Sequence, residues 1–385
     1  MSLHVTAISG SRADLGPLRP LLRGLARDHR FALSTVVCAV GSPEEAEQRL
    51  AAFAEAGLPV DEFVQDPDGP SSMVGQSARS LEGVGAALER LGPDLVVVLG
   101  DRFEILAATF AAHLLRIPIV HLSGGDETLG SLDDAMRHAI TRLASLHLPT
   151  NEEAAARLGA LGVPASRIHV VGSTALDDLV ALRPIPRDEL GRSIGLDLSG
   201  KVVAVTYHPA TQAAEPPVPT MRALLDAVRD VTPDAAVVVT GSNTDAGGPD
   251  IDALAAATAD ADDRMVFVAS LGPERYWTLL HHADAVVGNS SSGLIEAPVI
   301  GVPVVDVGER QRSRLRAETC LHAAADRAAI GAALRRALDL PRAPARSPYG
   351  DGHAVGRALE VLAGIDAPER LLEPLPVEVA RTERA

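Results

Sequence analysis

The sequence contains few cysteine, lysine and aromatic residues. Its 385 residues include two cysteines, Cys38 and Cys320, which excludes a disulfide framework and a four-thiolate zinc site and fits a reducing cytosol. One of the 35 basic residues is lysine, Lys201, so the other 34 are arginine and imine chemistry would depend on Lys201 alone. Aromatic residues make up 3% of the chain, too few for a base-stacking surface that binds nucleic acid. Arginine is therefore the expected partner of any phosphate group.

Long apolar runs and a surplus of positive charge are also missing. No uninterrupted apolar stretch reaches the roughly 18 residues of a membrane span, and the N-terminal segment lacks the basic and apolar regions of a signal peptide. The net charge of −16 argues against a broad surface for nucleic acid or anionic membranes. An anionic small ligand needs only a few local cations, so we predict a cytoplasmic protein with a small-molecule substrate and neither nucleic-acid nor membrane partners.

Short β-branched segments alternate with amphipathic segments along most of the chain. In the first half the predicted strands are 4–9, 35–40, 95–99, 118–122 and 168–171, and the predicted helices are 18–30, 44–56, 75–91, 103–115 and 133–144. In the second half the predicted strands are 202–206, 235–239, 265–269, 285–287 and 302–307, with helices such as 221–231 and 273–281. Strand–helix alternation is typical of parallel sheets covered on both faces, so we predict an α/β protein with two Rossmann-like domains.

Two prolines interrupt this pattern within residues 174–187, which we predict to be a hinge. We assign residues 1–175 to the first domain and 176–364 to the second. Residues 365–385 form a tail that either packs back or is disordered. Because such folds bind ligands beyond the carboxyl ends of their strands, we expect the site in the cleft between the domains.

Small residues and an arginine follow the first predicted strand. The segment SGSRADLG (9–16) would let backbone N–H groups approach an anion at a helix start, with Arg12 as a fixed cation. It lacks the spacing of a dinucleotide fingerprint and the lysine of a P-loop. A phosphate site and a plain strand-to-helix turn both remain open.

Acidic residues follow the next strands of the first half. Asp101 comes directly after an apolar strand and is either a general base or a helix cap. Four carboxylates and two histidines then lie within the 18 residues 121–138. Asp126 and Asp133 are candidates for acid–base work because crowded carboxylates shift one another's pKa values. Asp133 and Asp134 equally suit the start of a helix. A metal site is an alternative, but no HExxH motif occurs and we predict none.

Polar motifs also follow the strands of the second half. His208 binds a phosphate or sugar, or caps locally, and Asn243 follows the next strand. The run GNSSSG (288–293) opens a predicted helix that carries Glu296, which suits either an anion beside a ribose diol or an ordinary capped helix. Four arginines within residues 310–316 form either a solvated charge run or a pyrophosphate clamp.

Together these motifs resemble the hydrolysing UDP-N-acetylglucosamine 2-epimerases of the sialic- and legionaminic-acid pathways. The motifs that carry the resemblance are RAD (12–14), GDRFE (100–104), GGDETLGSLDDAMRHAIT (124–141), HPAT (208–211), GNSSSGLIEAP (288–298), GERQRSRLRAET (308–319) and SPYGDGHA (347–354). The non-hydrolysing branch typically has Gln-His-Arg after the second strand. This chain has CAVGS (38–42) there, which favours the hydrolysing branch.

The resemblance implies two facing Rossmann-like domains of glycosyltransferase-B type, a UDP-binding second domain and a homodimer or homotetramer. It implies removal of the C2 proton, loss of UDP to leave 2-acetamidoglucal, and addition of water to give N-acetylmannosamine, without a redox cofactor or a metal. By resemblance, Asp101 and Asp133 fall at catalytic carboxylates, and His208 falls at a histidine that contacts nucleotide or sugar. The predicted substrate-binding residues are Arg12, Arg102, Asn243, Ser290, Ser291, Glu296, Arg310 and Arg314, with the serines on phosphate and Glu296 on ribose.

One position departs from the family pattern. Many members have a catalytic glutamate two residues after the strand-end histidine, and others have histidine, where this chain has Ser123. A serine is no carboxylate base, so Asp126 or Glu127 takes over, water relays the proton, or the second half-reaction is lost. We include Asp126 among the predicted catalytic residues.

This departure keeps two other functions open. One is a nucleotide-sugar or nucleotide-phosphonate hydrolase without epimerisation, and the other is a non-catalytic nucleotide-sugar binding protein. The sugar is also open, because a diacetamido or otherwise altered nucleotide sugar fits the same motifs.

Overall fold

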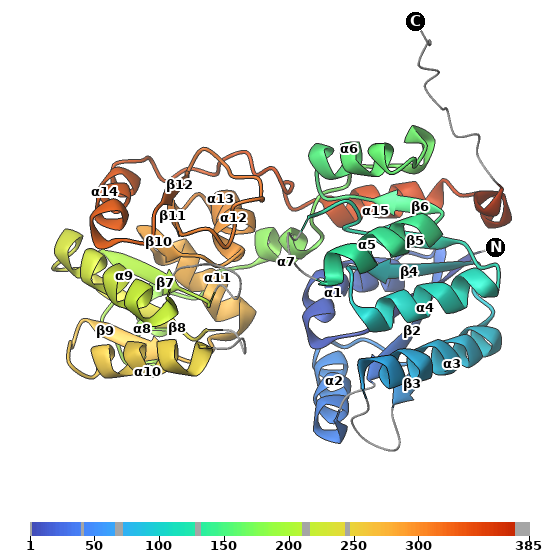
Figure 1. Ribbon diagram of the computed structural model, residues 1–385, viewed down its shortest axis with the longest axis horizontal. Coiled ribbons are helices and arrows are strands. Elements are labelled where there is room, and N and C mark those ends of the chain that lie inside the picture. The colour runs from blue at the N-terminus through green and yellow to red at the C-terminus, as the bar shows by residue number, and fades with distance from the viewer. Residues whose placement is uncertain are drawn as a thin grey trace, which may run out of the picture. The chain divides into compact units, whose positions relative to one another are not determined.

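The computed structural model describes residues 2–39, 42–65, 72–127, 132–209, 216–242 and 247–373. It divides into two compact units, of which the first comprises Met1–Asp178 with Gly352–Ala385 and the second Leu179–Asp351. Each unit is an α/β layer structure around its own sheet, as the sequence predicts (Figure 1). Within the described residues, no helix combines the length and the apolar character needed to cross a bilayer.

The first unit is built on a parallel six-stranded sheet in the order β3-β2-β1-β4-β5-β6. Its strands are β1 (Leu3–Ser9), β2 (Phe31–Ala39), β3 (Glu62–Gln65), β4 (Leu95–Leu99), β5 (Ile119–Leu122) and β6 (Leu146–Leu148). Its helices are α1 (Arg12–Arg27), α2 (Pro43–Glu55), α3 (Met73–Leu91), α4 (Phe103–Leu114), α5 (Leu132–Leu143), α6 (Glu152–Ala160) and α15 (Ala354–Ala363).

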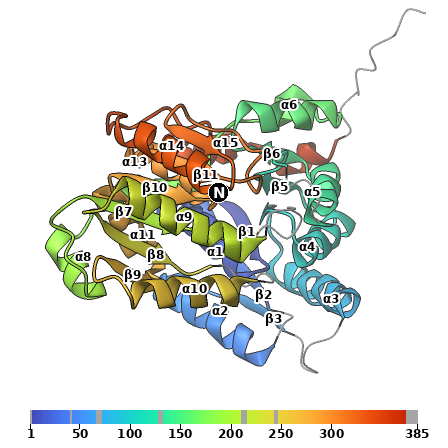
Figure 2. The same cartoon turned by 60° about the vertical axis from the view of Figure 1, so that its left-hand side comes forward.

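Helices cover both faces of this sheet because its strands are buried on both sides. All five residues of β4 are buried, which is the continuous apolar pattern expected of a central parallel strand. Side chains of α1, α2 and α15 pack in the core on one face. Side chains of α3, α4 and α5 pack in the core on the other, where these helices lie in a row (Figure 2).

The second unit repeats the same topology, with the parallel order β12-β11-β10-β7-β8-β9. Its strands are β7 (Val202–Thr206), β8 (Ala236–Thr240), β9 (Met265–Val268), β10 (Ala285–Gly288), β11 (Val304–Val307) and β12 (Cys320–Ala323). Its helices are α8 (Arg187–Ile194), α9 (Pro217–Val231), α10 (Gly248–Ala259), α11 (Gly272–His282), α12 (Ser292–Ile295), α13 (Ala297–Ile300) and α14 (Arg327–Leu338), and α7 (Ala175–Ala181) spans the unit boundary. Helices α9, α10 and α14 share one core with this sheet.

The predicted strand at 168–171 is wrong. That segment forms a single bridge between Ile168 and His147 and is not a strand. The prediction also missed the edge strands β3, β6 and β12, which are three or four residues long. β3 and β12 lie at sheet edges and are buried at only some positions, so they lack the continuous apolar run of a central parallel strand.

The observed units differ from the predicted boundaries at residues 352–364. This segment lies in the first unit, where α15, drawn in red, sits among blue and green elements (Figure 1). Ala358 and Leu362 are buried in the core that α1 covers, and a Cβ atom on Gly24 of α1 would lie 2.7 Å from Cγ1 of Val355. The apolar face of α15 gives no sign in the sequence of which sheet it will cover. Ile365 and Leu371 of the tail pack on the same core, and residues 374–385 lie outside the described residues.

In each sheet the strand order reverses between two neighbouring strands. These are β1 and β4 in the first unit and β7 and β10 in the second. Ligands of open α/β sheets bind beyond the carboxyl ends of the strands at such a reversal. The residues that follow these four strands are therefore the first place to look for a site.

Candidate active site

Asp101 lies just beyond the carboxyl end of β4, where the first sheet reverses. Gly100 turns the chain there with a φ of +84°. Arg102, and not Asp101, occupies the cap position of α4. The carboxylate of Asp101 forms an ion pair with Arg137 of α5, and its side chain is 22% exposed. The interpretation of Asp101 as a helix cap is therefore wrong.

Arg137 joins Asp101 to the other segments that carry acidic residues. Its side chain is 7% exposed. Nη2 donates to Asp101, while Nη1 donates to the backbone oxygen of Asp126 at 2.6 Å and to Oδ1 of Asp134 at 3.3 Å. One guanidinium thus connects the loop after β4, the loop after β5 and the start of α5. Sequence analysis gave Arg137 no role, although its spacing of three from Asp134 is a recognisable helix pair.

Asp133 places a second carboxylate near Asp101. Burial raises the pKa of Asp101; the Arg137 charge opposes this effect and the charge of Asp133 adds to it. Asp133 and Asp134 also lie in the first turn of α5, so the alternative role of helix-start acids holds as well. A carboxylate with a raised pKa beside a second acid is suited to proton transfer. Among the described residues, no group of three or more His, Cys, Asp and Glu side chains is placed to hold a metal ion.

The turn after β5 contains Ser123 and the two acids that the sequence offers in its place. Ser123 has a φ of +59°, a left-handed conformation that few residues other than glycine adopt. Oδ1 of Asp126 accepts a hydrogen bond from Oγ1 of Thr150 at 3.0 Å. Oε2 of Glu127 lies 3.6 Å from Nη2 of Arg157. Pairing with a cation makes a carboxylate a weaker base, which lowers the suitability of Glu127 for carrying a proton.

The turn after β1 is occupied by an internal carboxylate. Oδ2 of Asp14 accepts from the backbone nitrogens of Gly10 at 2.8 Å and of Ser11 at 2.7 Å, and Oδ1 accepts from the Ser11 hydroxyl at 2.7 Å. Asp14 is buried, which raises its pKa. This carboxylate takes the N–H groups that a phosphate would need, so the structure favours the plain strand-to-helix turn. Arg12 is the first residue of α1, and its role stays a prediction.

The side chain of Arg102 forms an ion pair with the buried Glu104. Its Nε donates to Oε1 of Glu104 at 2.6 Å, and its guanidinium lies 5.6 Å from the centre of the Phe103 ring. Glu104 is 1% exposed, and burial raises its pKa. A Cβ atom on Gly10 would lie 2.5 Å from Cγ of Glu104, so the turn after β1 packs directly on this acid. The side chain of Arg102 is 44% exposed and remains able to contact a ligand.

In the second unit, Asn289 organises the residues at the sheet reversal. Asn289 follows β10 and is 1% exposed. Its Oδ1 accepts from the backbone nitrogen of His208 at 2.7 Å, and its Nδ2 donates to the backbone oxygen of His208 at 2.8 Å. Nη1 of Arg310 and Nε2 of Gln311 donate to the backbone oxygen of Asn289 at 3.0 and 2.9 Å. The predicted residues His208 and Arg310 therefore meet on an asparagine to which sequence analysis gave no role.

The serine-rich run opens a short helix that ends before Glu296, and not the helix carrying Glu296 that the sequence predicts. Ser290 and Ser291 precede α12, which has four residues, and Glu296 lies between α12 and α13. Pro298 at the start of α13 lacks an N–H group and cannot continue the hydrogen bonding of α12. Hydroxyl and N–H groups, and not a long helix dipole, are thus what this segment presents to an anion. Glu296 accepts a hydrogen bond from the Ser292 hydroxyl, and burial raises its pKa.

The arginine run divides into separate roles. Nε and Nη2 of Arg316 donate to Oδ2 of the buried Asp306 at 3.0 and 2.7 Å, so Arg316 holds the core. Arg312 is 81% exposed and lies 3.6 Å from Oε2 of Glu309, as a solvated charge does. Arg310 is tied to Asn289, as described above, and Arg314 is partly buried. The contacts of Arg312 and Arg316 do not fit the clamp interpretation, and the roles of Arg310 and Arg314 stay predictions. Asn243 lies outside the described residues.

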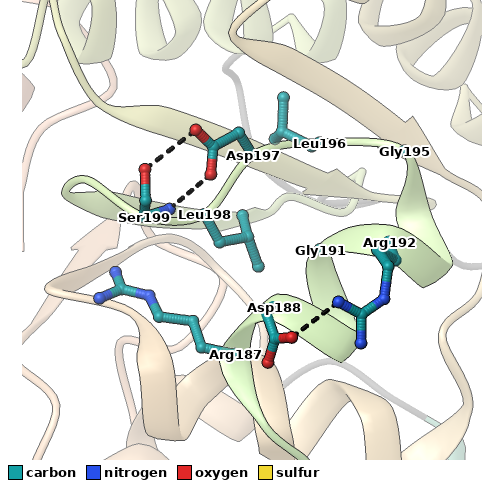
Figure 3. Close-up of a pocket in the computed structure, with 9 residues that line it drawn as sticks. All are labelled: Arg187, Asp188, Gly191, Arg192, Gly195, Leu196, Asp197, Leu198 and Ser199. Carbon is teal, nitrogen blue, oxygen red and sulfur yellow. Dashed lines mark hydrogen bonds and ion pairs between the residues drawn. The ribbon is translucent and has the colours of Figure 1, made fainter.

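A pocket of about 640 Å³ lies elsewhere in the second unit, between α8 and residues 195–199 (Figure 3). Nη1 of Arg192 donates to Asp188 at 2.7 Å, and Asp197 accepts from Ser199. These residues precede β7, so they lie at the amino ends of the strands, at the opposite edge from His208. None of the predicted site residues lines this pocket.

Comparison with known proteins identifies the family. A sequence profile described as UDP-N-acetylglucosamine 2-epimerase matches residues 24–363. The chain belongs to the UDP-N-acetylglucosamine 2-epimerase family. A Legionella pneumophila protein named UDP-N,N'-diacetylbacillosamine 2-epimerase (hydrolyzing) is 31% identical over 380 residues, which cover 97% of this chain and 98% of that protein. A Neisseria meningitidis serogroup B protein named UDP-N-acetylglucosamine 2-epimerase is 28% identical over 354 residues, or 91% of each chain.

The fold of this epimerase family member matches that of solved structures. The crystal structure of the UDP-GlcNAc 2-epimerase of Neisseria meningitidis bound to UDP-GlcNAc is similar with a TM-score of 0.75 and 16% sequence identity. The similarity covers 94% of this chain and 99% of that chain. The predicted fold class, two Rossmann-like units of the glycosyltransferase-B type, is thereby confirmed.

Proposed function

We propose that this family member is a hydrolysing 2-epimerase, which converts UDP-N-acetylglucosamine or a related acetamido nucleotide sugar to UDP and the free 2-epimeric sugar. The observation that carries the proposal is the geometry of Asp101. Its partly buried carboxylate stands at the sheet reversal, beside Asp133, with a pKa that burial raises. The hydrolysing relative from Legionella supports the hydrolysing branch. So does the segment after β2, which lacks the Gln-His-Arg of the other branch.

In the first step, Asp101 takes the proton from C2 of the sugar. The C2–H electron pair forms a C1–C2 double bond as the C1–O bond breaks, and its electron pair leaves with UDP. Positive charge and N–H or O–H donors lower the barrier because negative charge develops on the departing diphosphate. Arg310, Ser290 and Ser291 supply these groups in the proposal. The acids of the first unit and the donors of the second must therefore act on the same substrate.

In the second step, water adds to C1 of the glycal and a proton returns to C2 on the opposite face. A carboxylic acid is required where many family members have glutamate and this chain has Ser123. Asp126 fills this role in the proposal because it follows the same turn as Ser123 and its Oδ1 accepts a hydrogen bond from the Thr150 hydroxyl, whereas Glu127 lies beside Arg157. The steps as written balance without a redox cofactor or a metal, so dialysis against EDTA should leave the rate unchanged.

The sugar is tested by comparing two substrates in deuterated water. Purified protein is incubated with UDP-N-acetylglucosamine or with UDP-N,N'-diacetylbacillosamine, the compound in the name of the Legionella relative. We expect UDP and a free 2-epimeric sugar with deuterium at C2. NMR spectra recorded during the reaction measure both products. An epimer that remains attached to UDP would instead show a non-hydrolysing enzyme. Free sugar that keeps its C2 proton would contradict epimerisation by proton transfer.

Ser123 favours a second candidate, a nucleotide-sugar hydrolase without epimerisation. If the second half-reaction lacks its acid, UDP and the glycal accumulate. A hydrolase without epimerisation would instead add water directly at C1 as the C1–O bond to UDP breaks, and would release free sugar with its C2 proton and configuration unchanged. Ser123→Glu then raises the share of the 2-epimer, whereas Ser123→Gly, which suits the left-handed backbone, leaves it unchanged. UDP binding measured by calorimetry, with no turnover of either sugar, would instead identify a binding protein.

A further inference from the structure

We propose that Arg137 is a positioning residue for Asp101, fixing the direction of the carboxylate and keeping it ionised at neutral pH. This inference rests on the proposed function, in which Asp101 removes the C2 proton. Arg137 lies 36 residues from Asp101 in the sequence and on a different element, α5. Its contact with Asp101 brings a cation from α5 to the loop after β4.

The geometry divides the two oxygens of Asp101 between two tasks. Nη2 of Arg137 binds Oδ2. Within the described part of the chain, no other side chain makes a hydrogen bond to this carboxylate. Oδ1 is therefore left to face the substrate, on a side chain that is 22% exposed. A base that abstracts a carbon-bound proton works only when it is held in line with that proton, so fixing one oxygen aims the other.

The guanidinium is itself held rigidly, which a single ion pair would not achieve. Nη1 donates to the backbone oxygen of Asp126 and to Oδ1 of Asp134, and Oδ2 of Asp134 lies 3.5 Å from Nε2 of His138. The planar fork of arginine is anchored at three points on three segments. Lysine has one nitrogen and cannot bridge the same three points. In the proposal, only arginine at position 137 fixes the direction of the Asp101 carboxylate, whereas any cation at this position supplies the opposing charge.

The charge argument follows from the groups around Asp101. Arg137 and Asp133 face it from α5, and Arg102 faces it from its own loop. Burial and Asp133 raise the pKa of Asp101, while the two arginines lower it. Removing Arg137 leaves the carboxylate beside Asp133 with one less opposing charge. The base would then be protonated at a higher pH and unavailable to abstract a proton.

The test compares Arg137→Gln and Arg137→Lys with the wild-type protein by measuring UDP release across pH. Arg137→Gln is expected to move the acid limb of kcat upward by about 1 to 3 pH units, the usual effect of an adjacent opposite charge on an aspartate. Arg137→Lys keeps the charge, so its acid limb should stay near that of the wild type while kcat falls at least tenfold and UDP affinity is kept.

Arg142→Gln is the matched control, because Arg142 lies on the same helix and its Nη1 donates to the backbone oxygen of Leu161 at 2.8 Å. It should keep both the pH profile and kcat. A merely structural role for Arg137 would lower activity and thermal stability in both variants without moving the acid limb, and that result overturns the proposal. If Arg137→Gln does not fold, unchanged kcat in Arg137→Lys also overturns it. Wild-type protein without turnover contradicts the proposed function instead, which separates the two failures.

Discussion

The two units share one strand order but carry opposite chemistry where that order reverses. In the first unit, Asp101 pairs with Arg137 and lies near Asp133. In the second, the neutral Asn289 draws together His208 and Arg310. Both groups stand at the carboxyl ends of equivalent strands, so the sheets supply the same frame and the loops supply the difference. Under the proposed function, the first unit transfers protons and the second binds the diphosphate of the substrate.

The strongest test of this division between the units removes the proposed base while keeping the shape of its side chain. Asp101→Asn should lower turnover by about 10²- to 10⁴-fold, the usual contribution of a positioned general base. UDP affinity measured by calorimetry should change by less than about threefold, because the donors to phosphate belong to the second unit in the proposal. Solvent deuterium at C2 should disappear together with turnover. A parallel loss of UDP affinity would show that the chemistry is not divided in this way.

Two glycines at equivalent positions allow the two sheets to be compared by the stability of their alanine variants. Gly100 and Gly288 follow or end the fourth strand of each unit, with φ of +84° and +150°. A Cβ atom on Gly288 would overlap the backbone oxygen of Thr206, whereas one on Gly100 would meet no atom within 4 Å. We expect Gly288→Ala to lower the free energy of unfolding by about 3 to 5 kcal/mol through overlap and backbone strain.

Gly100→Ala carries the backbone strain alone, so about 1 to 2 kcal/mol is expected for it. Thermal unfolding of both variants, followed by circular dichroism, provides the measurement. Equal losses in the two variants would mean that the close approach of β7 and β10 at Gly288 does not restrict this position.

Asn289→Ala tests the organisation of the second unit. Each lost hydrogen bond to buried backbone costs about 1 to 3 kcal/mol, part of which appears as weaker binding because His208 and Arg310 are no longer held. We expect UDP affinity to fall roughly 10- to 100-fold, while bound substrate still exchanges its C2 proton. Asn151→Ala is the matched control, since Asn151 is a buried asparagine of the first unit that caps α6. It should lose stability and keep UDP affinity.

The sequence predicted the frame better than the contacts that complete the site. β4 and β7 begin and end at the predicted residues because continuous apolar runs mark buried parallel strands. Asp101 was placed correctly after its strand, but its pairing with Arg137 depends on how α5 packs, which no local pattern records. The N–H groups after β1 looked open to phosphate until the structure showed the carboxylate of Asp14 on them. Sequence spacing predicts which groups lie near a strand end. It does not predict which of these groups form hydrogen bonds or ion pairs with one another.

The last comparison separates the units by their response to acid. Burial lowers the pKa of His121 to about 4 and that of His147 to about 3, and both histidines lie in adjacent strands of the first unit. His121 is neutral there, and Nε2 donates to the backbone oxygen of Gly100 at 2.9 Å, since a carbonyl can only accept. The unfolded chain binds protons near pH 6.5, which the folded chain does not bind until pH about 4 or lower. The stabilisation is therefore present above pH 6.5 and is lost as the pH falls toward 4.

The expected loss is about 1.4 kcal/mol per pH unit for each histidine in this range. The carboxylates with raised pKa values, which occur in both units, act in the opposite direction. Amide exchange measured by mass spectrometry at pH 7 and pH 5, corrected for the intrinsic rate, should show faster opening of β5 and β6 than of β7 and β8. His147→Leu should reduce that difference, because it removes a buried ring whose Nδ1 has no hydrogen-bond partner among the described residues. Equal acid sensitivity of the two sheets in the wild type would mean that buried histidines do not set the stability of the first unit, and that the units differ in chemistry alone.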